Sequence, residues 1–329
     1  MGDATDKGTL RVSSPGVSFI TTVLNEESTV RAFLESVVIQ TRAPDEIIIV
    51  DGGSRDRTAE RVQALIDEGN PIRLIVEACS VSRGRDIAIE AAEFDVIAIS
   101  DAGCRLDPSW LEKITAPFAN PDVDVVAGYY RLGGTTQFGD LCARLFSVRP
   151  ERIRAATFSP SHRSVAYRKK CWSAVGGYPD TPFFGEDSYF NDRIRKAGFR
   201  SVFEPGALVT WDVRPTWRTF ARQHFKYAYG YGYLRTISFA LAVRTAVHDL
   251  AVMLLLASVF IPALLAAAPL LLASYYAVLV ANRLRLGGRV AAREWPAAFA
   301  VLATRELALT LGFVAGLLRS FTRVKSGPR

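Results

Sequence analysis

Residues 17–27 read VSFITTVLNEE, and residues 46–58 read EIIIVDGGSRDRT. Each stretch is a short apolar run that ends in polar residues and turn formers, which is the pattern of a buried β-strand. Between the two, apolar side chains recur at helical spacing, at Val30, Phe33, Leu34, Val37 and Val38. Strand, helix and strand in this order predict a parallel sheet covered by helices.

The same alternation extends outward from these two stretches. Strands are predicted over 17–24, 47–50, 72–76, 96–100 and 123–130. Helices are predicted over 56–66, 83–93, from Pro108 onward, over 140–153 and over 187–196. The predicted fold class is therefore α/β, with a Rossmann-like, mostly parallel sheet and flanking helices over residues 17–214.

The carboxy-terminal third is apolar. No charged side chain occurs from Leu250 to Ala281, a stretch too long for one membrane span, and Pro262 and Pro269 lie near its middle. We therefore predict a tight transmembrane hairpin over 247–282 that breaks between these two prolines. Residues 295–318 are also apolar but carry Arg305 and Glu306, and a charge at mid-membrane costs on the order of 3 kcal/mol. A helix lying in the membrane interface is favoured there over a third span.

The remaining boundaries follow from composition. Residues 1–16 are polar without an apolar core, which predicts a flexible tail. Residues 215–246 are predicted to form an amphipathic interfacial segment, and residues 283–329 a basic loop with a membrane-associated helix.

Much of the net charge of +7 lies beside the apolar segments, which favours anionic headgroups over nucleic acid as a partner. Four cysteines without C-x-x-C spacing argue against zinc or disulfides. The expected location is the inner (plasma) membrane, multi-pass, with the catalytic domain in the cytoplasm.

Polar residues follow the predicted strands directly. Asn25 and Glu26 follow the first strand, Asp51 the second and Asp101 the fourth. In open α/β sheets, ligands bind outside the carboxyl ends of the strands, so these side chains should converge. Carboxylates there suit a nucleoside and a divalent cation, and nearby arginines suit phosphates.

Five segments in this order resemble family 2 glycosyltransferases of the GT-A fold. They are VSFITTVLNEE, EIIIVDGGSRDRT, SRGRDIAI (82–89), ISDAGCRLDP (99–108) and FFGEDSYFNDRIRKAGFR (183–200). The resemblance covers about residues 17–200. The apolar tail of the chain is similar to the tails of bacterial enzymes of exopolysaccharide and glycolipid assembly. It implies an inverting transfer of a sugar from a nucleotide sugar, which we predict to be a UDP- or GDP-sugar. The membrane anchoring favours a lipid or lipid-linked acceptor at the cytoplasmic membrane face.

The resemblance also implies roles for individual residues. The nucleotide pocket would be lined by Thr22, Asn25, Glu26, Asp51 and Ser54, with Arg83 and Arg85 near the diphosphate. Asp101 takes the first position of the family's D-x-D motif and would hold Mg2+ or Mn2+. Gly103 stands at the third position, where the family has a second aspartate.

Glu186 and Asp187 match the family's acidic pair. An inverting transfer needs a carboxylate that takes the proton of the acceptor hydroxyl. The resemblance assigns this role of general base to Asp187, while Glu186 would orient the acceptor or hold the loop. Aromatic side chains beside the pair could stack on a sugar face, namely Tyr178, Phe183 and Phe184.

The segment 220–232 departs from the Q-x-x-R-W motif of processive relatives. Gln223 aligns with it, but Lys226 and Tyr227 replace the Arg-Trp pair. This favours transfer of a single sugar, with Lys226 able to touch the donor diphosphate. An interfacial amphipathic helix is the favoured structural interpretation of the same segment.

Other interpretations of these residues remain open. Asp51 and Asp101 could be turn formers, Asp187 a helix cap, and Arg83 and Arg85 surface charges. No histidine is assigned a role. A nucleotidyltransferase would need a Gly-rich loop after the first strand, and a dehydrogenase a G-x-G-x-x-G motif, and neither is present. Because Gly103 stands in place of the second aspartate, an alternative function remains open. The chain could be a non-catalytic membrane protein that binds a nucleotide sugar and is the partner of another glycosyltransferase.

Overall fold

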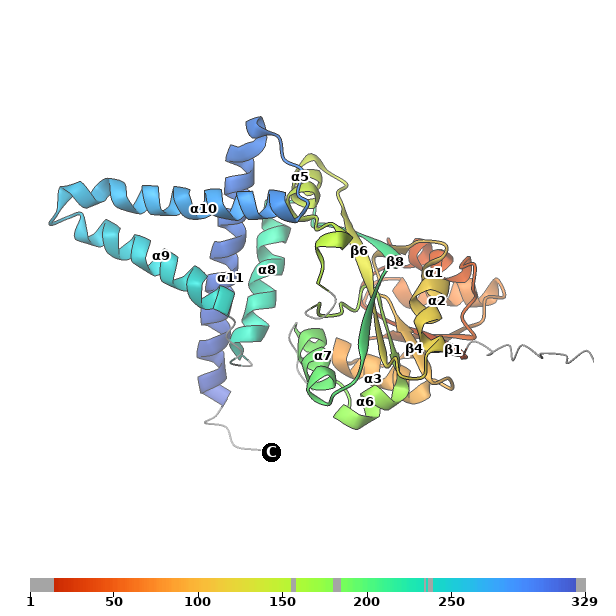
Figure 1. Cartoon of the computed structure of the whole chain (residues 1–329). Helices are drawn as coiled ribbons and strands as arrows, with labels where there is room; N and C mark the ends of the chain where they lie inside the picture. The colour runs from red at the N-terminus through yellow and green to blue at the C-terminus, as the bar shows by residue number, and fades with distance from the viewer. Residues whose placement is uncertain (1–14, 155–157, 180–184, 234, 236–238, 324–329) are drawn as a thin grey trace, which may run out of the picture.

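The computed structural model describes residues 15–154, 158–179, 185–233, 235 and 239–323. An α/β domain is followed by a helical carboxy-terminal part (Figure 1). The strands are β1 (Val17–Val23), β2 (Glu46–Asp51), β3 (Ile72–Val76), β4 (Val96–Ile99), β5 (Cys104–Leu106), β6 (Val125–Gly133), β7 (Val165–Arg168) and β8 (Ser201–Asp212). The helices of this domain are α1 (Val30–Val38), α2 (Thr58–Asp67), α3 (Val81–Ala91), α4 (Trp110–Thr115), α5 (Gln137–Phe146), α6 (Lys169–Val175) and α7 (Glu186–Lys196).

The described strands form one sheet in the order β3-β2-β1-β4-β7-β6-β8-β5. The first four pair in parallel, and β7 then joins β4 in the antiparallel direction. Val23 lies opposite Asp51, and Asp51 lies opposite Val76, so β1, β2 and β3 end at one edge. The predicted α/β sheet with flanking helices is confirmed, and its second half mixes parallel and antiparallel pairs.

Two apolar layers hold helices on the two faces of the sheet. Alternate side chains of a strand point to opposite faces, so Phe19 and Ile20 belong to different layers. The Phe19 layer receives α1, α2 and α4, whereas the Ile20 layer receives α3, α6 and α7. Burial on both faces explains the continuous apolar run Ile47–Val50 of β2 and the adjacent apolar residues Phe19 and Ile20 of β1.

Four helices form the carboxy-terminal part: α8 (Trp217–Tyr233), α9 (Phe239–Ala257), α10 (Ala267–Leu286) and α11 (Trp295–Arg323). Helices α8 and α11 lie side by side, and glycines let their backbones approach closely. A Cβ atom on Gly316 would lie 2.1 Å from the Tyr229 carbonyl oxygen, and one on Gly312 would lie 2.2 Å from that of Phe225. Gly312 and Gly316 form a G-x-x-x-G spacing, the small-residue pattern of close helix pairs.

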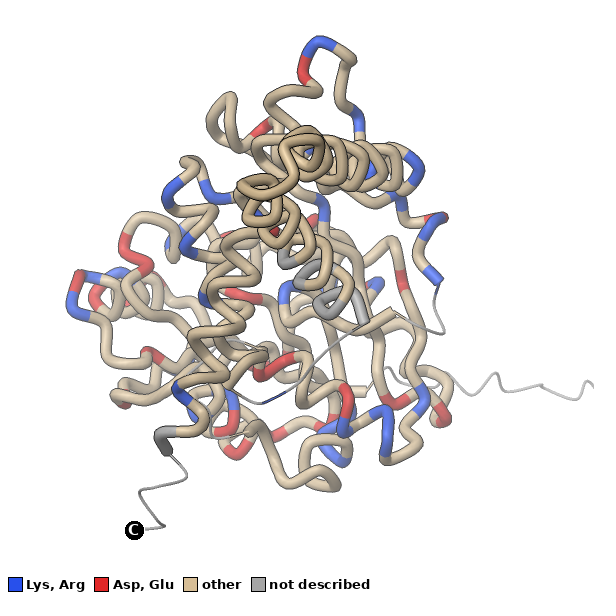
Figure 2. The backbone as a smooth tube through the Cα atoms, turned by 90° about the vertical axis from the view of Figure 1, so that its left-hand side faces the viewer, with Lys and Arg blue, Asp and Glu red and all other residues tan. Residues whose placement is uncertain are grey.

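Helices α9 and α10 form a hairpin that projects away from the sheet (Figure 1). Figure 2 shows the hairpin end-on and almost without charged residues. His248 Nε2 lies 2.9 Å from the Tyr276 hydroxyl and ties the two helices together. By length and composition, two stretches of the described chain could cross a membrane, Pro262–Leu286 and Ala292–Phe321.

Some predicted boundaries were wrong. The helix expected over 140–153 is α5 (Gln137–Phe146), whose first turn is capped by Thr136 Oγ1 accepting from the Gly139 N–H. It ends early because Pro150 disfavours a helical conformation at Arg149, which is extended at φ −72° and ψ 137°. The chain reverses over residues 258–266 rather than between the two prolines, and Pro269 lies inside the first turn of α10, where proline is tolerated.

Candidate active site

The loops after β1 and β2 are joined by hydrogen bonds from polar side chains. Asp51 Oδ1 accepts from the backbone N–H groups of Gly53, at 2.9 Å, and Ser54, at 2.7 Å. Ser54 Oγ accepts from the Asn25 N–H at 2.9 Å, and Asn25 Oδ1 accepts from the Arg55 N–H at 2.9 Å. Three of the predicted nucleotide-pocket residues are therefore neighbours.

The second carboxylate oxygen of Asp51 has no donor among the described residues. The side chain is 1% exposed, and Oδ2 is buried without a hydrogen bond. A buried carboxylate oxygen is costly unless a donor satisfies it. A ligand N–H or hydroxyl, such as those of a nucleoside, would supply that donor.

Thr22 and Glu26 lie at the same edge of the sheet. Thr22 is partly buried, and its Cγ2 would lie 2.9 Å from a Cβ on Gly84, so the missing side chain of Gly84 lets α3 pack closely on β1. The Glu26 carbonyl accepts from the Thr29 and Val30 N–H groups at the start of α1, and its carboxylate accepts from the Thr29 hydroxyl. Contact of either residue with a nucleotide stays a prediction.

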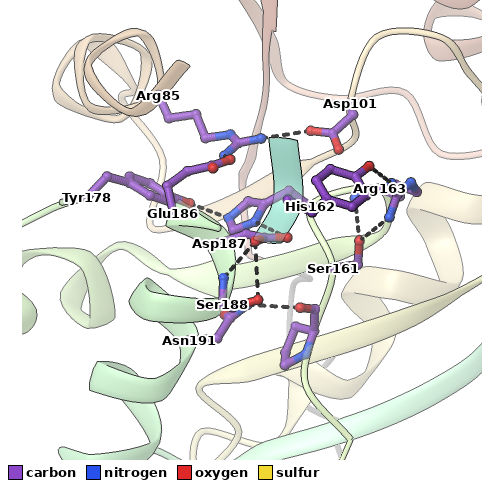
Figure 3. Close-up of polar contacts among 12 residues, drawn as sticks. Arg85, Asp101, Ser161, His162, Arg163, Tyr178, Glu186, Asp187, Ser188 and Asn191 are labelled. Carbon is purple, nitrogen blue, oxygen red and sulfur yellow. Dashed lines mark hydrogen bonds and ion pairs between the residues drawn. The ribbon is translucent and has the colours of Figure 1, made fainter. Parts of the chain in front are cut away.

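Arg85 is the centre of the candidate site (Figure 3). Its side chain is 5% exposed, and its guanidinium donates to Asp101 Oδ1 at 2.8 Å and to Glu186 Oε1 at 2.7 Å. Burial opposes the charge, but the two carboxylates outweigh it and raise the pKa of Arg85. Asp101 follows β4 and Glu186 begins α7, so this one side chain from α3 joins residues far apart in the sequence.

Arg83 lies elsewhere. Its side chain is 48% exposed and donates to Glu90 at 3.0 Å along the surface of α3. A position near a donor diphosphate stays a prediction for both arginines, and the Arg85 guanidinium is already paired with Asp101 and Glu186.

Asp187 lies in the first turn of α7, beside the Arg85 cluster. Its Oδ1 accepts from the Ser188 N–H at 2.7 Å, and its side chain remains 31% exposed. Burial raises its pKa, but His162, Arg85 and the Ser188 N–H together lower it further, so the pKa of Asp187 lies below its usual value. A partly exposed, ionised carboxylate can accept a proton as a general base, and the lowered pKa makes it a weaker one.

His162 lies beside Asp187 and was not singled out from the sequence. Its Nδ1 is 3.9 Å from Asp187 Oδ2, too long for a hydrogen bond, and its Nε2 is 2.5 Å from the Tyr178 hydroxyl. Burial and then the Arg85 charge lower the pKa of His162. Buried His162 therefore lies between the Tyr178 hydroxyl and the Asp187 carboxylate. A lone histidine in an irregular segment carries no sequence signal of this position.

Tyr178 supports the same cluster from behind. Its ring stacks on Phe190 with centroids 4.0 Å apart, and the Arg85 guanidinium lies 5.6 Å from its centroid. The side chain is buried, so the ring packs in the core here, although sugar stacking was considered for it. Phe183 and Phe184, considered with it, lie outside the described residues.

The D-x-D position has an unusual backbone. Gly103 has a φ of +87°, and no atom lies within 4 Å of the place where a Cβ would be. The described residues contain no group of three or more His, Cys, Asp or Glu side chains placed to hold a metal. Asp101 is 35% exposed and uses Oδ1 for Arg85. These residues fit a cation held by one protein carboxylate together with a ligand's phosphates.

Helix α8 contributes tyrosines to the site. The Tyr231 hydroxyl lies 3.2 Å from Ser188 Oγ, and the Tyr227 hydroxyl accepts from Arg163 at 3.4 Å and from Gln223 at 2.9 Å. Lys226 is exposed on the same helix, and its contact with a diphosphate stays a prediction.

Comparison with known proteins identifies the family. Residues 18–165 match the family described as "Glycosyl transferase family 2", and residues 96–284, more than half of the chain, match "Glycosyl transferase family group 2". The chain therefore belongs to the family 2 glycosyltransferases. The predicted family and enzyme class are confirmed.

Relatives with assigned names are also glycosyltransferases. Glycosyltransferase AglE of Haloferax volcanii is 26% identical over 61% of this chain and 68% of that protein. The probable glycosyltransferase YdaM of Bacillus subtilis is 24% identical over 67% of this chain and 56% of its own length. The poly-beta-1,6-N-acetyl-D-glucosamine synthase of Staphylococcus aureus is 24% identical over 65% and 54%. The chain thus spans little more than half of the latter two relatives.

A solved structure supports the fold. The mannosyltransferase PcManGT from Pyrobaculum calidifontis, in complex with GDP-Man and Mn2+, superposes with a TM-score of 0.57 at 19% identity. The similarity covers 94% of this chain and 88% of that one. The GT-A type of α/β fold is thereby confirmed.

Proposed function

We propose that this chain transfers a single sugar, with inversion, from a UDP- or GDP-sugar to a lipid or lipid-linked acceptor at the cytoplasmic face of a membrane. The observation that carries the proposal is the convergence of Asp101, Glu186 and Asp187 around buried Arg85. The Asp51 loop lies at the same sheet edge and would bind the nucleoside. The named activities of the relatives support the class of reaction.

The proposed step is a direct displacement. The acceptor oxygen attacks the anomeric carbon, the bond from that carbon to the donor phosphate oxygen breaks, and the nucleoside diphosphate leaves with the electron pair. Asp187 takes the proton of the acceptor hydroxyl. Arg85 pairs with Glu186, which is next to the proposed base Asp187, and with Asp101, which lies on the proposed donor side. One buried side chain would therefore position the groups that act on the acceptor and on the donor.

A divalent cation fits the donor side. Asp101 would hold Mg2+ or Mn2+ together with the donor diphosphate, and the cation would neutralise charge on the leaving group. Binding of Mn2+ with a GDP-sugar by PcManGT supports this part of the proposal.

The arrangement of the helices supports a membrane-bound enzyme with the α9–α10 hairpin inserted. Helix α10 crosses α11 instead of running along it (Figure 1), so a membrane spanned by the hairpin would have α11 lying along its surface. An apolar stripe on α11 is exposed, consisting of Leu307, Leu311, Val314, Leu318 and Phe321. Glu306 is 2% exposed and pairs with Arg305 at 2.6 Å, so this charge is turned inward. A position of α11 in the membrane interface agrees with both the exposed apolar stripe and the buried charge of Glu306.

The donor can be identified with purified full-length protein. We would incubate it with a membrane lipid extract and a panel of nucleotide sugars, with Mn2+ or with EDTA, and measure the released nucleotide. We expect release from one UDP- or GDP-sugar, and loss of release in EDTA. Ligand-dependent stabilisation without any released nucleotide would instead favour the non-catalytic, nucleotide-sugar-binding partner.

Asp187→Asn tests the base. The amide oxygen can still accept from the Ser188 N–H, so we expect folding and nucleotide binding to be kept while turnover falls by about 10²-fold or more. Asp192→Asn is the matched control on the same helix, because Asp192 is exposed and pairs only with Arg195 and Lys196 among the described residues. Near-normal turnover in Asp187→Asn would remove the assignment.

A further inference from the structure

A cavity of about 470 Å³ lies between the sheet and the carboxy-terminal helices. Its walls come from β6, α5, β8 and α8 on one side and from the ends or middle of α10 and α11 on the other. This volume is typical of a site for a small molecule or a headgroup. None of the residues assigned above to the nucleotide or to the metal lines it.

The lining of this cavity is cationic and aromatic. Among the described residues it includes Arg154, Arg163, Arg283 and Arg305 but no aspartate or glutamate. Bringing several guanidinium groups together in a partly enclosed space is unfavourable unless an anion joins them. Arginine is also the side chain best suited to grip phosphate oxygens.

Arg163 lies between the cavity and the candidate active site. Its guanidinium stacks 4.1 Å from the Trp211 ring centroid and 5.0 Å from that of Tyr130. Its donors reach only neutral groups among the described residues, the hydroxyls of Ser161 and Tyr227, and its Nε is buried without a partner. Figure 3 shows Arg163 on the side of the site that carries Asp101. No described carboxylate pairs directly with Arg163, and the charge of Asp101 acts on it only from a longer distance.

Arg283 and Arg305 share one aromatic ring at the opposite wall. Their guanidinium carbons lie 5.1 Å and 5.6 Å from the Phe146 ring centroid. Glu306 pairs with Arg305 at 2.6 Å, and its charge also acts on Arg283, against the repulsion from Arg305. Two arginines therefore meet at Phe146 with one carboxylate between them.

We infer that this cavity binds the phosphate of an amphiphilic acceptor, whose apolar tail would leave along the α9–α10 hairpin and α11. Arg163 and Arg283 grip the phosphate from two sides, and Trp211, Tyr130 and Phe146 cover the groups next to it. The inference rests on the proposed function and specifies its acceptor. The tail is indicated because two walls belong to the helices that are apolar on their outer surfaces.

Binding can be measured on full-length protein in nanodiscs by calorimetry with three probes: dodecyl phosphate, dodecanol and inorganic phosphate. We expect dodecyl phosphate to bind, dodecanol to bind far more weakly, and inorganic phosphate to bind more weakly than dodecyl phosphate. Arg283→Gln and Arg163→Gln should each weaken dodecyl phosphate by about tenfold or more. Arg285→Gln is the matched control, because Arg285 is exposed on the same helix and does not line the cavity.

Each contrary result has a definite meaning. If dodecanol bound as tightly as dodecyl phosphate, the cavity would not be a site for an anion. If inorganic phosphate bound as tightly as dodecyl phosphate, the ligand would not need an apolar tail. An unchanged affinity in both cavity variants, with the thermal midpoint of unfolding also unchanged, would overturn the location. Nucleotide release from a donor sugar is measured in the same preparation. Nucleotide release without binding of dodecyl phosphate would contradict only this inference. Absence of nucleotide release from every donor sugar would contradict the proposed function.

Discussion

At the scale of the residue, the candidate site depends on one buried arginine. Arg85 offers one guanidinium to two carboxylates, and neither Asp101 nor Glu186 would keep its position without it. Removing one partner of a buried ionic network leaves uncompensated charge, which is far more costly than losing an exposed pair. Arg85 is therefore a positioning residue, while Asp187, which is reachable, is the proposed base.

Gly103 gives a direct test of the metal. Gly103→Asp would restore the second aspartate of the D-x-D motif in open space, at a φ of +87° that aspartate tolerates better than most residues. We expect Mn2+ to bind about tenfold more tightly, because a second carboxylate oxygen joins Asp101. Calorimetry with Mn2+ in the presence of UDP or GDP measures this.

Gly103→Ala controls for the backbone, since it adds strain without a ligand. An equal Mn2+ affinity in both variants would show that position 103 does not face the cation.

Individual residues were predicted unevenly from the sequence. The meeting of Asp51 with Ser54 and Asn25 follows from the rule that parallel strands end at one sheet edge, so pattern alone sufficed. Arg85 and Arg83 have the same residue type on one helix, and only packing decides that one is buried and the other exposed. His162 and Arg163 approach the site through tertiary contacts that no local pattern records.

At the scale of the element, local patterns predicted the first half of the sheet well. Strand and helix alternate there, and each unit is recognisable from its own residues. Strands β5, β7 and β8 were not predicted, because β5 and β7 are short and all three pair with distant segments. The register of β8 also shifts near Pro205 and Gly206, which interrupts the period of two.

The contact of α8 with α11 is predicted to depend on Gly316. In Gly316→Leu the new side chain would collide with the Tyr229 carbonyl, and overpacking of this kind costs about 1–3 kcal/mol or more. We expect a lower midpoint of thermal unfolding and, because α8 carries Tyr227 and Tyr231, a loss of nucleotide release.

Val314→Leu places the same side chain on the exposed face of α11, where Val314 is 44% exposed, and should change neither quantity. If both variants behaved alike, the close approach of the two helices would not matter for activity.

At the scale of the whole molecule, the charge and apolar surface are segregated. The α/β domain lies on one side and the hairpin on the other (Figure 1), and the hairpin is almost without charge (Figure 2). The proposed orientation inserts this hairpin and leaves Arg283, Arg285 and the carboxy-terminus on the cytoplasmic side, as the positive-inside rule asks.

Labelling in intact cells tests this orientation. Ser258→Cys, at the turn of the hairpin, should react with a membrane-impermeant maleimide added outside, whereas Arg285→Cys should not. A carboxy-terminal tag should resist external protease. Cleavage of that tag would contradict the two-span arrangement and favour a third span in α11, whereas labelling at position 285 would contradict the inserted hairpin itself.

The tyrosines of α8 connect the carboxy-terminal helices to the candidate active site. A chain shortened after residue 214 to gain solubility would keep every described strand and the carboxylates of the candidate active site. It would lose Tyr227, which holds Arg163, and Tyr231, which contacts Ser188 next to the proposed base. Rates measured on such a fragment would describe a site with one wall missing, so weak activity there would say little about the intact protein.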